Sequence, residues 1–233
     1  MKKNSTVVFQ TLADFIFPRH CYGCETTLKF YEQSLCLKCQ INLPLTTLHL
    51  TKENLLFQKL KTHFALEAAT SLFYFEKEGV LSHLIHLFKY KKVKKIGPFL
   101  GAWLGDTLLE SQLFNQVDGI VPVPLHPTKK RKRGYNQSDL IAEALSKKMK
   151  LPVFSKLLIR VKNTSALALL GESERKREVR NAFEINSKRQ THPLHLLLVD
   201  DVLTTGATLT ACATALLSNA NIKLSIAVLA CRL

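Results

Sequence analysis

The strongest pattern of apolar positions lies near the carboxyl end of the chain. An unbroken apolar run from Leu196 to Val199 predicts a strand of a parallel sheet that is buried on both faces. Apolar residues then recur at spacings of three and four, which predicts a helix, at Leu209, Cys212, Ala213, Leu216 and Leu217. A buried strand, a short loop and a helix in this order favour an α/β sheet, which binds its ligand at the carboxyl ends of its strands.

The spacing of apolar residues also predicts helices and strands along the rest of the chain. One-sided apolar patterns predict helices at 5–17, 78–90 and 97–113, and another that carries Leu140, Ile141, Ala144, Leu145 and Met149. Strands are expected at 70–75 and from Asp118 to the prolines at 122 and 124, which stop a strand ladder. The pattern weakens from Pro44 to Phe64, where we expect a linker or a mixed segment.

The loop between the strand at 196–199 and the helix that begins near Leu209 combines acidic residues with small and hydroxylic ones. It contains, in order, Asp200, Asp201, Thr204, Thr205, Gly206, Ala207 and Thr208. The unpaired N–H groups and the positive dipole end at a helix amino terminus bind phosphate. Carboxylates would repel that phosphate, so the acidic pair must face sugar hydroxyls, a divalent cation or both. The loop therefore predicts a site for a ribose 5-phosphate.

Two C-x-x-C pairs near the amino terminus supply Cys21, Cys24, Cys36 and Cys39. Each pair presents two thiolates to one ion, and this spacing predicts a closed, structural zinc site. Disulfides are the alternative, but we expect no export signal and therefore favour metal. The metal would supply the folding free energy of a module too small for a core of its own. We expect Cys212 and Cys231 to be core residues instead.

The formal net charge of +15 implies contact with nucleic acid, an anionic surface or phosphorylated substrates. The charge is concentrated in two runs, one of which contains Tyr90. For the first run, a solvated helix end and a stripe that faces nucleic acid are both open. For the second, a nucleic-acid patch and a pyrophosphate clamp both remain. The runs consist of Lys89, Lys91, Lys92, Lys94 and Lys95, and of Lys129, Lys130, Arg131, Lys132 and Arg133.

The apolar stretches do not predict a membrane protein. Asp14 interrupts the apolar amino-terminal segment, so we expect no signal peptide. The longest uncharged run, residues 202–222, begins with the phosphate loop, so we expect no transmembrane helix. These expectations predict a cytoplasmic protein.

The loop at Val199–Leu209 resembles the phosphoribosyl diphosphate (PRPP) motif of type I phosphoribosyltransferases. Together with the four cysteines, nearly the whole chain resembles the ComF family of bacterial competence-associated proteins. Further matching segments are Lys89-Tyr90, Val121–Leu125, Arg133–Gln137, Arg160 with Thr164, Glu174-Arg175, Ala182-Phe183 and Arg232. The resemblance implies an α/β fold: a type I phosphoribosyltransferase-like parallel sheet flanked by helices, at 65–233, with a small N-terminal four-cysteine zinc module, at 1–50.

The resemblance also implies the roles of site residues. The catalytic pair Asp200 and Asp201 would position the ribose of PRPP, and the basic run through Arg133 would form a mobile loop that closes over the pyrophosphate. Magnesium would bind together with PRPP. Besides the residues of the phosphate loop, the PRPP-binding residues would be Pro122, Val123, Pro124, Leu125, Arg133 and Val199.

Three functions follow, of which the first two are compatible and the third, without catalysis, is an alternative. The first is a PRPP-binding protein of natural transformation, either an active phosphoribosyltransferase or a former one, although no residue cluster indicates the acceptor. The second is a module that binds single-stranded DNA through the basic runs, with Tyr90 and Tyr135 as stacking faces. The third is a zinc-dependent adaptor that docks other proteins of the competence machinery.

Overall fold

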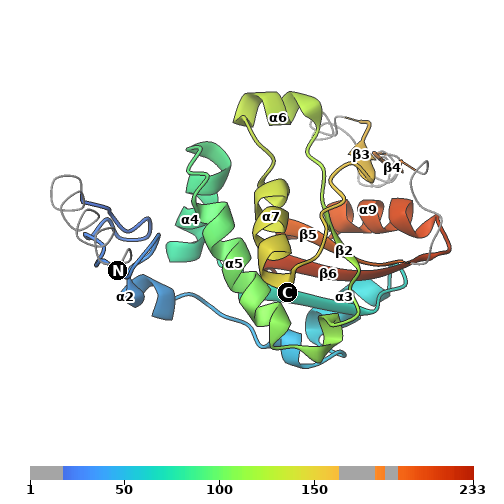
Figure 1. The fold of residues 1–233 in the computed structure, drawn as a ribbon, viewed down its shortest axis with the longest axis horizontal. Coiled ribbons are helices and arrows are strands. Elements are labelled where there is room, and N and C mark those ends of the chain that lie inside the picture. Colours follow the sequence, from blue (N-terminus) through green and yellow to red (C-terminus); the bar gives the residue numbers. More distant parts are fainter. Residues whose placement is uncertain (1–17, 163–181, 187–193) are drawn as a thin grey trace, which may run out of the picture.

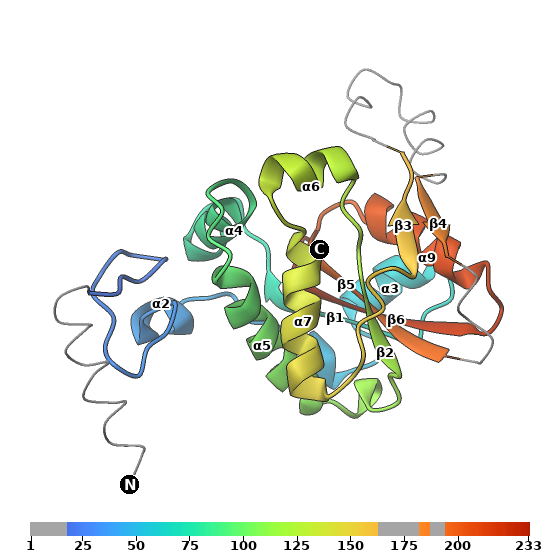
Figure 2. The ribbon, with the colours of Figure 1, turned by 45° about the horizontal axis from the view of Figure 1, so that its top comes forward.

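The computed structural model describes residues 18–162, 182–186 and 194–233. A parallel sheet forms its centre, and helices cover both faces of the sheet (Figures 1 and 2). The predicted fold class, a parallel sheet flanked by helices with a four-cysteine cluster near the amino terminus, is confirmed. The helix predicted at 5–17 and the motifs at 164 and 174–175 lie outside the described residues.

The strands of the sheet run in the order β1-β6-β5-β2, and each neighbouring pair is parallel. They are β1 (Ala68–Tyr74), β2 (Gly119–Pro122), β5 (Leu194–Leu203) and β6 (Ile222–Cys231). Burial of the two central strands explains their nearly continuous apolar sequences. β5 pairs with β2 as far as Val199 but with β6 as far as Leu203. The end of β5 therefore continues past its pairing with β2.

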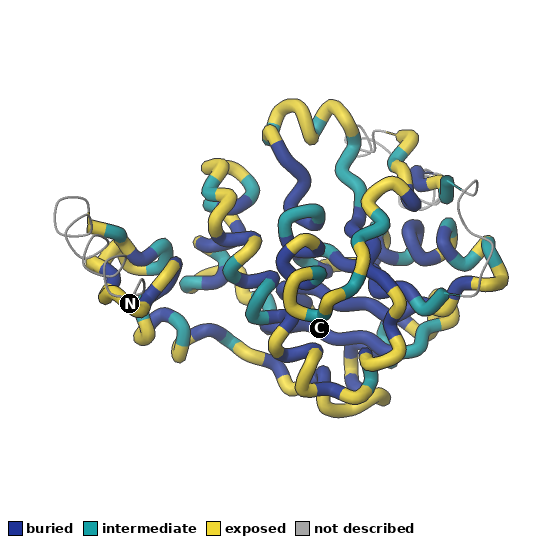
Figure 3. The backbone as a smooth tube through the Cα atoms, viewed as in Figure 1, coloured by how far each residue is buried: buried dark blue, intermediate teal, exposed yellow. Residues whose placement is uncertain are grey.

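Two hydrophobic layers fill the space between the sheet and the helices. On one face lie α4 (Val80–Tyr90), α5 (Ile96–Leu109) and α7 (Gln137–Met149). On the other lie α3 (Leu55–Lys61) and α9 (Ala207–Leu217), and the short antiparallel pair β3 (Leu158–Arg160) and β4 (Phe183–Ile185) packs against α9. Figure 3 shows burial concentrated in the sheet and on the inner sides of these helices.

The segment expected as a linker is a folded part of the body. The Tyr74 N–H of β1 donates to the Pro44 carbonyl at 2.8 Å. A 3-10 turn, η1 (Leu48–Leu50), and α3 follow. The Asn54 side chain caps α3 and also donates to the Ala69 carbonyl of β1 at 2.8 Å. Of the two alternatives expected here, a linker and a mixed segment, the structure shows the mixed segment; its elements are too short to produce a long periodic pattern.

The second basic run also differs from its prediction. It lies in a helix, α6 (Pro127–Arg133), and not in a loop. Pro127 occupies the first turn, where its missing N–H costs nothing, and the His126 side chain accepts the Thr128 N–H. Gly134 ends the helix with a φ of 87°. The sequence therefore contains start and stop signals for this helix, but the interpretation of the run rested on its charge and not on these signals.

Two further boundaries and the membrane prediction can be compared with the structure. The helix predicted at 97–113 ends at Leu109, and a separate 3-10 turn, η2 (Gln112–Phe114), follows. The uncharged run at 202–222 is divided between a strand end, a loop and α9. Among the described residues, no helix combines the length and apolar character that crossing a membrane requires.

Candidate functional site

The loop between β5 and α9 brings backbone N–H groups to the carboxyl edge of the sheet. Gly206 precedes α9 with a φ of 81°, a left-handed conformation that glycine adopts without strain. Thr204 and Thr205 are exposed. The N-cap residue, Gly206, has no side chain to cap α9, and the Ala207 N–H makes only a long hydrogen bond, 3.5 Å, to Thr205 Oγ1. A small hollow lies among Asp200 and residues 202–209. The loop thus has the form of an anion site at a helix amino terminus.

The acidic pair stands at the end of β5, and different helices hold its two members. Ser138 Oγ, at the start of α7, donates to Asp200 Oδ1 at 2.9 Å. Lys89 Nζ, at the end of α4, lies 3.0 Å from Asp201 Oδ1. Because Asp201 is only 7% exposed, Lys89 neutralises a carboxylate that has little water around it. Both carboxylates are therefore fixed in place before any ligand arrives.

The environment of Asp200 shifts its protonation toward neutral pH. Burial, followed by the neighbouring charge of Asp201, raises the pKa of Asp200 to about 7. The hydrogen bond from Ser138 and the charge of Lys89 act in the opposite direction. Burial also raises the pKa of the Cys212 thiol of α9, which interacts with the charge of Asp200. A cation or a hydroxyl donor that approached Asp200 would favour its charged form.

Three cations from α6 and β3 are electrostatically coupled near this edge. Burial lowers the pKa of Lys129, and the charges of Arg160 and Arg133 lower it further. Burial also lowers the pKa of Arg160, whereas the Asp200 charge opposes that shift. Arg133 donates to the Gln137 side-chain oxygen at the start of α7. Cations that repel one another in this way create a positive potential that suits an anion such as pyrophosphate.

The loop after β2 reaches the same edge. Pro122 ends β2, and the Val123 N–H donates to the Val199 carbonyl at 2.9 Å. The Asn136 side chain donates to the Val123 carbonyl at 3.0 Å, which ties the start of α7 to this loop. Pro124 and Leu125 are half-buried. The structure therefore brings the predicted 122–125 segment, the acidic pair and the phosphate loop to one edge of the sheet.

Sequence reasoning missed some residues of this edge. Ser138 was not predicted, and Asn136 appeared only within the matching segment Arg133–Gln137, without a role of its own. Lys89 was grouped with the nucleic-acid stripe, although the structure places it on Asp201. Asn136, two residues after Gly134, is of a type that favours the first position of a helix, so the start of α7 has a local signal. Nothing local indicates that Ser138 meets Asp200, 62 positions along the chain.

The remaining cations of the basic runs lie mostly on the surface. Tyr90 is 65% exposed, and the Arg133 guanidinium lies 5.7 Å from the centre of its ring. Tyr135 is 6% exposed and donates to the Phe88 carbonyl, so the prediction of Tyr135 as a stacking face was wrong. Lys129 is partly buried, and Lys130 lies 3.1 Å from Asp139. The exposed cations are Lys91, Lys92, Lys94, Lys95, Lys130, Arg131 and Lys132.

The four predicted cysteine ligands form one cluster, in which all Sγ atoms lie within 4.8 Å of one another. Cys24 Sγ and Cys36 Sγ are 3.6 Å apart. A tetrahedral ion with Zn–S bonds of about 2.3 Å places its ligands about 3.8 Å apart, so the cluster fits zinc. The Gly23 and Cys36 N–H groups both donate to Cys21 Sγ at 3.3 Å, as outer-shell donors do to thiolate ligands. Four cysteines could thus hold one metal ion.

The four-cysteine module, residues 18–43, packs against the start of α4. A Cβ added to Gly23 would lie 2.9 Å from both Cys39 Sγ and a methyl group of Val80. This close approach requires glycine at position 23. The module and the body therefore meet beside the metal cluster (Figure 2).

No family model matches the chain, but individual proteins do. Competence protein F of Haemophilus influenzae is 34% identical over 133 residues, which cover 55% of this chain and 58% of that protein. DNA utilization protein YhgH of Escherichia coli is 34% identical over 142 residues, 60% of this chain and 62% of that one. Competence protein ComFC of Bacillus subtilis is 32% identical over 93 residues, 39% of this chain and 34% of that one.

Among solved structures, the chain is similar to UMP synthase of Leishmania donovani, with a TM-score of 0.37 and 20% identity over 64% of this chain and 24% of that chain. The matched part spans about 60% of the length of the first two curated relatives. The matches in sequence and the cysteine cluster confirm the resemblance of this chain to the ComF-type competence and DNA utilization proteins.

Proposed function

We propose that the chain binds PRPP together with Mg²⁺ at the carboxyl edge of β5, and that this binding serves the handling of single-stranded DNA in natural transformation. One observation carries the first part: a carboxylate pair and a helix amino terminus that begins at a glycine lie at the end of a single strand. An anion and a polyhydroxyl or cationic group must meet there, and PRPP with its metal contains all of these.

The contacts suggest a division of roles. The N–H groups of residues 204–208 would bind the 5-phosphate, while Asp200 and Asp201 would accept hydrogen bonds from the ribose hydroxyls. The pyrophosphate would face residues 122–125 and the cations Arg133 and Arg160. Lys89 would neutralise Asp201 in the free protein and become available to the ligand when hydroxyls or metal replace it.

Magnesium suits this edge because carboxylate and phosphate oxygens are its preferred ligands. Bound there, the ion would neutralise pyrophosphate as a leaving group. An active phosphoribosyltransferase would then need an acceptor nucleophile at C1 of the ribose. Release of pyrophosphate that depends on an added acceptor would distinguish such an enzyme from a protein that only binds PRPP, and from a zinc-dependent adaptor.

Calorimetric titration tests the PRPP site. The wild-type protein should bind PRPP with Mg²⁺ more tightly than ribose 5-phosphate or pyrophosphate, because each fragment satisfies only one part of the edge. Asp200→Asn/Asp201→Asn should lose this binding. Glu110→Gln, which changes an exposed carboxylate at the end of α5, is the matched control and should bind normally. Equal binding by the double variant would contradict the proposal.

The DNA part of the proposal rests on charge and on the names of the relatives, which include competence and DNA utilization. Exposed lysines follow α4, exposed cations cover α6, and Tyr90 offers an open ring between the two. Fluorescence anisotropy with a labelled oligonucleotide at low salt tests it. No measurable binding would reject it and leave the PRPP site untouched.

A further inference from the structure

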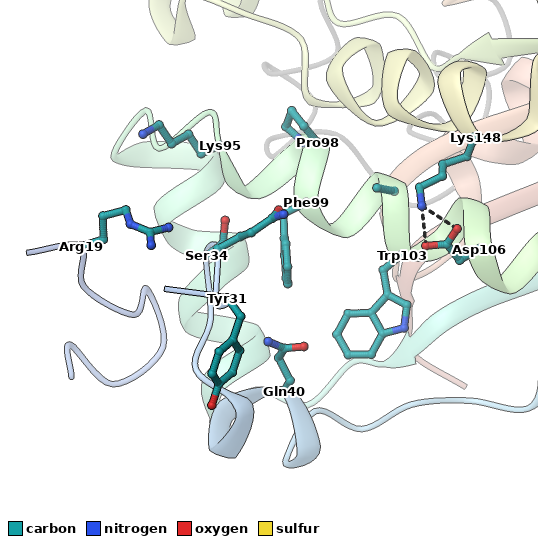
Figure 4. A pocket seen from close by; sticks show the side chains of 12 residues that line it. Arg19, Tyr31, Ser34, Gln40, Lys95, Pro98, Phe99, Trp103, Asp106 and Lys148 are labelled. Atoms are coloured by element: carbon teal, nitrogen blue, oxygen red, sulfur yellow. Dashed lines mark hydrogen bonds and ion pairs between the residues drawn. The ribbon is translucent and has the colours of Figure 1, made fainter. Parts of the chain in front are cut away.

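A hollow of about 680 Å³ separates the four-cysteine module from α5 (Figure 4). Arg19, Tyr31 and Gln40 line it from the module, and Lys95, Phe99 and Trp103 line it from α5. Neither the PRPP site nor the metal cluster uses these side chains. We call this hollow the module groove.

Aromatic rings line both walls of the module groove. Phe99 and Trp103 lie one helical turn apart, with ring centres separated by 6.3 Å and planes 75° apart. Trp103 meets the buried ring of Phe73 edge-on at 5.5 Å, which fixes its orientation. Tyr31 is 57% exposed on the opposite wall. A planar ligand could therefore stack on rings whose positions are already set.

Cations lie at the borders of the same groove. The Arg19 guanidinium is held by the Glu32 carbonyl at 2.9 Å. Lys95 is exposed and follows Lys91, Lys92 and Lys94 in the turn between α4 and α5, so this basic turn leads directly into the groove. At another border, Lys148 Nζ lies 2.7 and 2.8 Å from the two carboxylate oxygens of Asp106.

We propose that the module groove binds single-stranded nucleic acid, with bases stacked on Tyr31, Phe99 and Trp103 and the phosphodiester backbone beside Arg19 and Lys95. Every base has a face that stacks on an aromatic ring, so this binding tolerates any sequence. Bases in a duplex are already stacked and cannot enter. The inference rests on the proposed handling of single strands and adds the place where the bases bind.

The composition of the chain provides a direct reporter. Trp103 is its single tryptophan, so intrinsic tryptophan fluorescence comes from the groove alone. An oligothymidylate should quench this fluorescence over the same concentration range in which its anisotropy rises. An abasic strand of equal length should bind more weakly and quench little, because it retains the phosphates but lacks the bases. PRPP with Mg²⁺ should not quench it.

Variants locate the stacking. Tyr31→Ala and Phe99→Ala should each weaken oligonucleotide binding about 5- to 150-fold, the range expected for the loss of one stacked base. Ile41→Ala is the matched control, because Ile41 is 72% exposed on the same module but does not line the groove. Zinc content and thermal stability should remain normal. Tyr31→Leu, a change on the surface, keeps the test valid if Phe99→Ala does not fold.

Each outcome has a clear meaning. Binding in anisotropy without quenching, and without an effect of Tyr31→Ala, overturns the groove but leaves strand handling intact. Absence of binding at low salt overturns both. Quenching by an acidic peptide and not by oligonucleotides would make the groove a protein-docking surface and also overturn the inference. Equal quenching by uridine and thymidine strands supports stacking without selection between RNA and DNA.

Discussion

The carboxyl edge of β5 and the four-cysteine module differ in what holds their binding atoms in place. At the sheet edge, the residues that precede Asp200 are fully buried between two parallel neighbours. The module buries only a few apolar side chains and leaves Phe30, Leu37 and Ile41 exposed. The first site is therefore supported by the core without its ligand, whereas we expect the second to depend on a metal ion that joins its cysteines.

The largest expected effect comes from breaking the module. The protein should contain one zinc per chain by elemental analysis. Cys24→Ser, or chelation, should unfold the module at a cost on the order of 10 kcal/mol, while the far-ultraviolet signal of the sheet persists. Cys231→Ala, which changes a cysteine buried in β6, should retain the metal. Absence of zinc, or normal metal binding by Cys24→Ser, would refute the metal centre.

The next effect distinguishes lysines of a single basic run. Lys89→Met should destabilise the fold by about 3 kcal/mol in urea, because it leaves Asp201 buried without its cation. Lys91→Met, at an exposed position, should change stability by less than about 0.5 kcal/mol. In a double-mutant cycle, Asp201→Asn should recover part of the loss. Equal effects of the two lysine variants would remove Lys89 from the acidic site.

A smaller effect concerns pH. Because the pKa of Asp200 is raised to about 7, the folded state holds a proton that the unfolded state releases near pH 4. Stability should therefore fall as pH rises from about 4 to about 7, since folding must then take up a proton that is increasingly scarce, and should level off above that range, where Asp200 is charged in both states. Asp200→Asn should melt higher than wild type at pH 8, by about 2 to 4 °C for each kcal/mol, and the difference should shrink at pH 5. A difference that does not vary with pH would contradict the raised pKa.

The smallest effect is on the salt dependence of DNA binding. Changing Lys91, Lys92, Lys94 and Lys95 to glutamine should flatten the plot of log affinity against log salt, by about 0.7 for each phosphate that the variant no longer neutralises. PRPP binding should survive, since these exposed side chains lie outside the acidic site. An unchanged slope would place the backbone-binding cations elsewhere, with those of α6 as the next candidates.

The geometry of the two candidate sites could be predicted from the sequence because each is encoded locally. The phosphate loop is contiguous, and Gly206 has the left-handed φ that its position requires. The cysteine pairs have a spacing that one ion can join, and the four sulfurs do gather. Local patterns also gave the strand at 70–75 and the helices of α4 and α7 with only small errors at their ends. The strand predicted at 196–199 is longer: β5 continues to Leu203, so Asp200 and Asp201 lie in the strand and not in the loop, because pairing with β6 carries the ladder past the apolar run.

The rest depends on contacts between distant segments. Lys89 and Asp201 are separated by the whole middle of the chain. The two walls of the module groove come from residues 19–40 and from residues 95–106, with the segment from 41 to 94 between them. The burial of Tyr135 could not be predicted either, because its hydroxyl bonds to the Phe88 carbonyl, far away in the sequence, and the residues around Tyr135 show only the pattern of a turn. The assignment of two domains, residues 1–50 and 65–233, stays a prediction, although residues 44–61 pack on the body.

The most direct test of the ribose phosphate site is the free energy of unfolding in urea with and without PRPP and Mg²⁺. At a hundredfold excess over the dissociation constant, the ligand should stabilise the wild-type protein by about 2.7 kcal/mol. Asp200→Asn/Asp201→Asn should gain nothing relative to its own ligand-free value, although it folds. The same gain in both proteins, or none in the wild type, would contradict the assignment of the β5 edge.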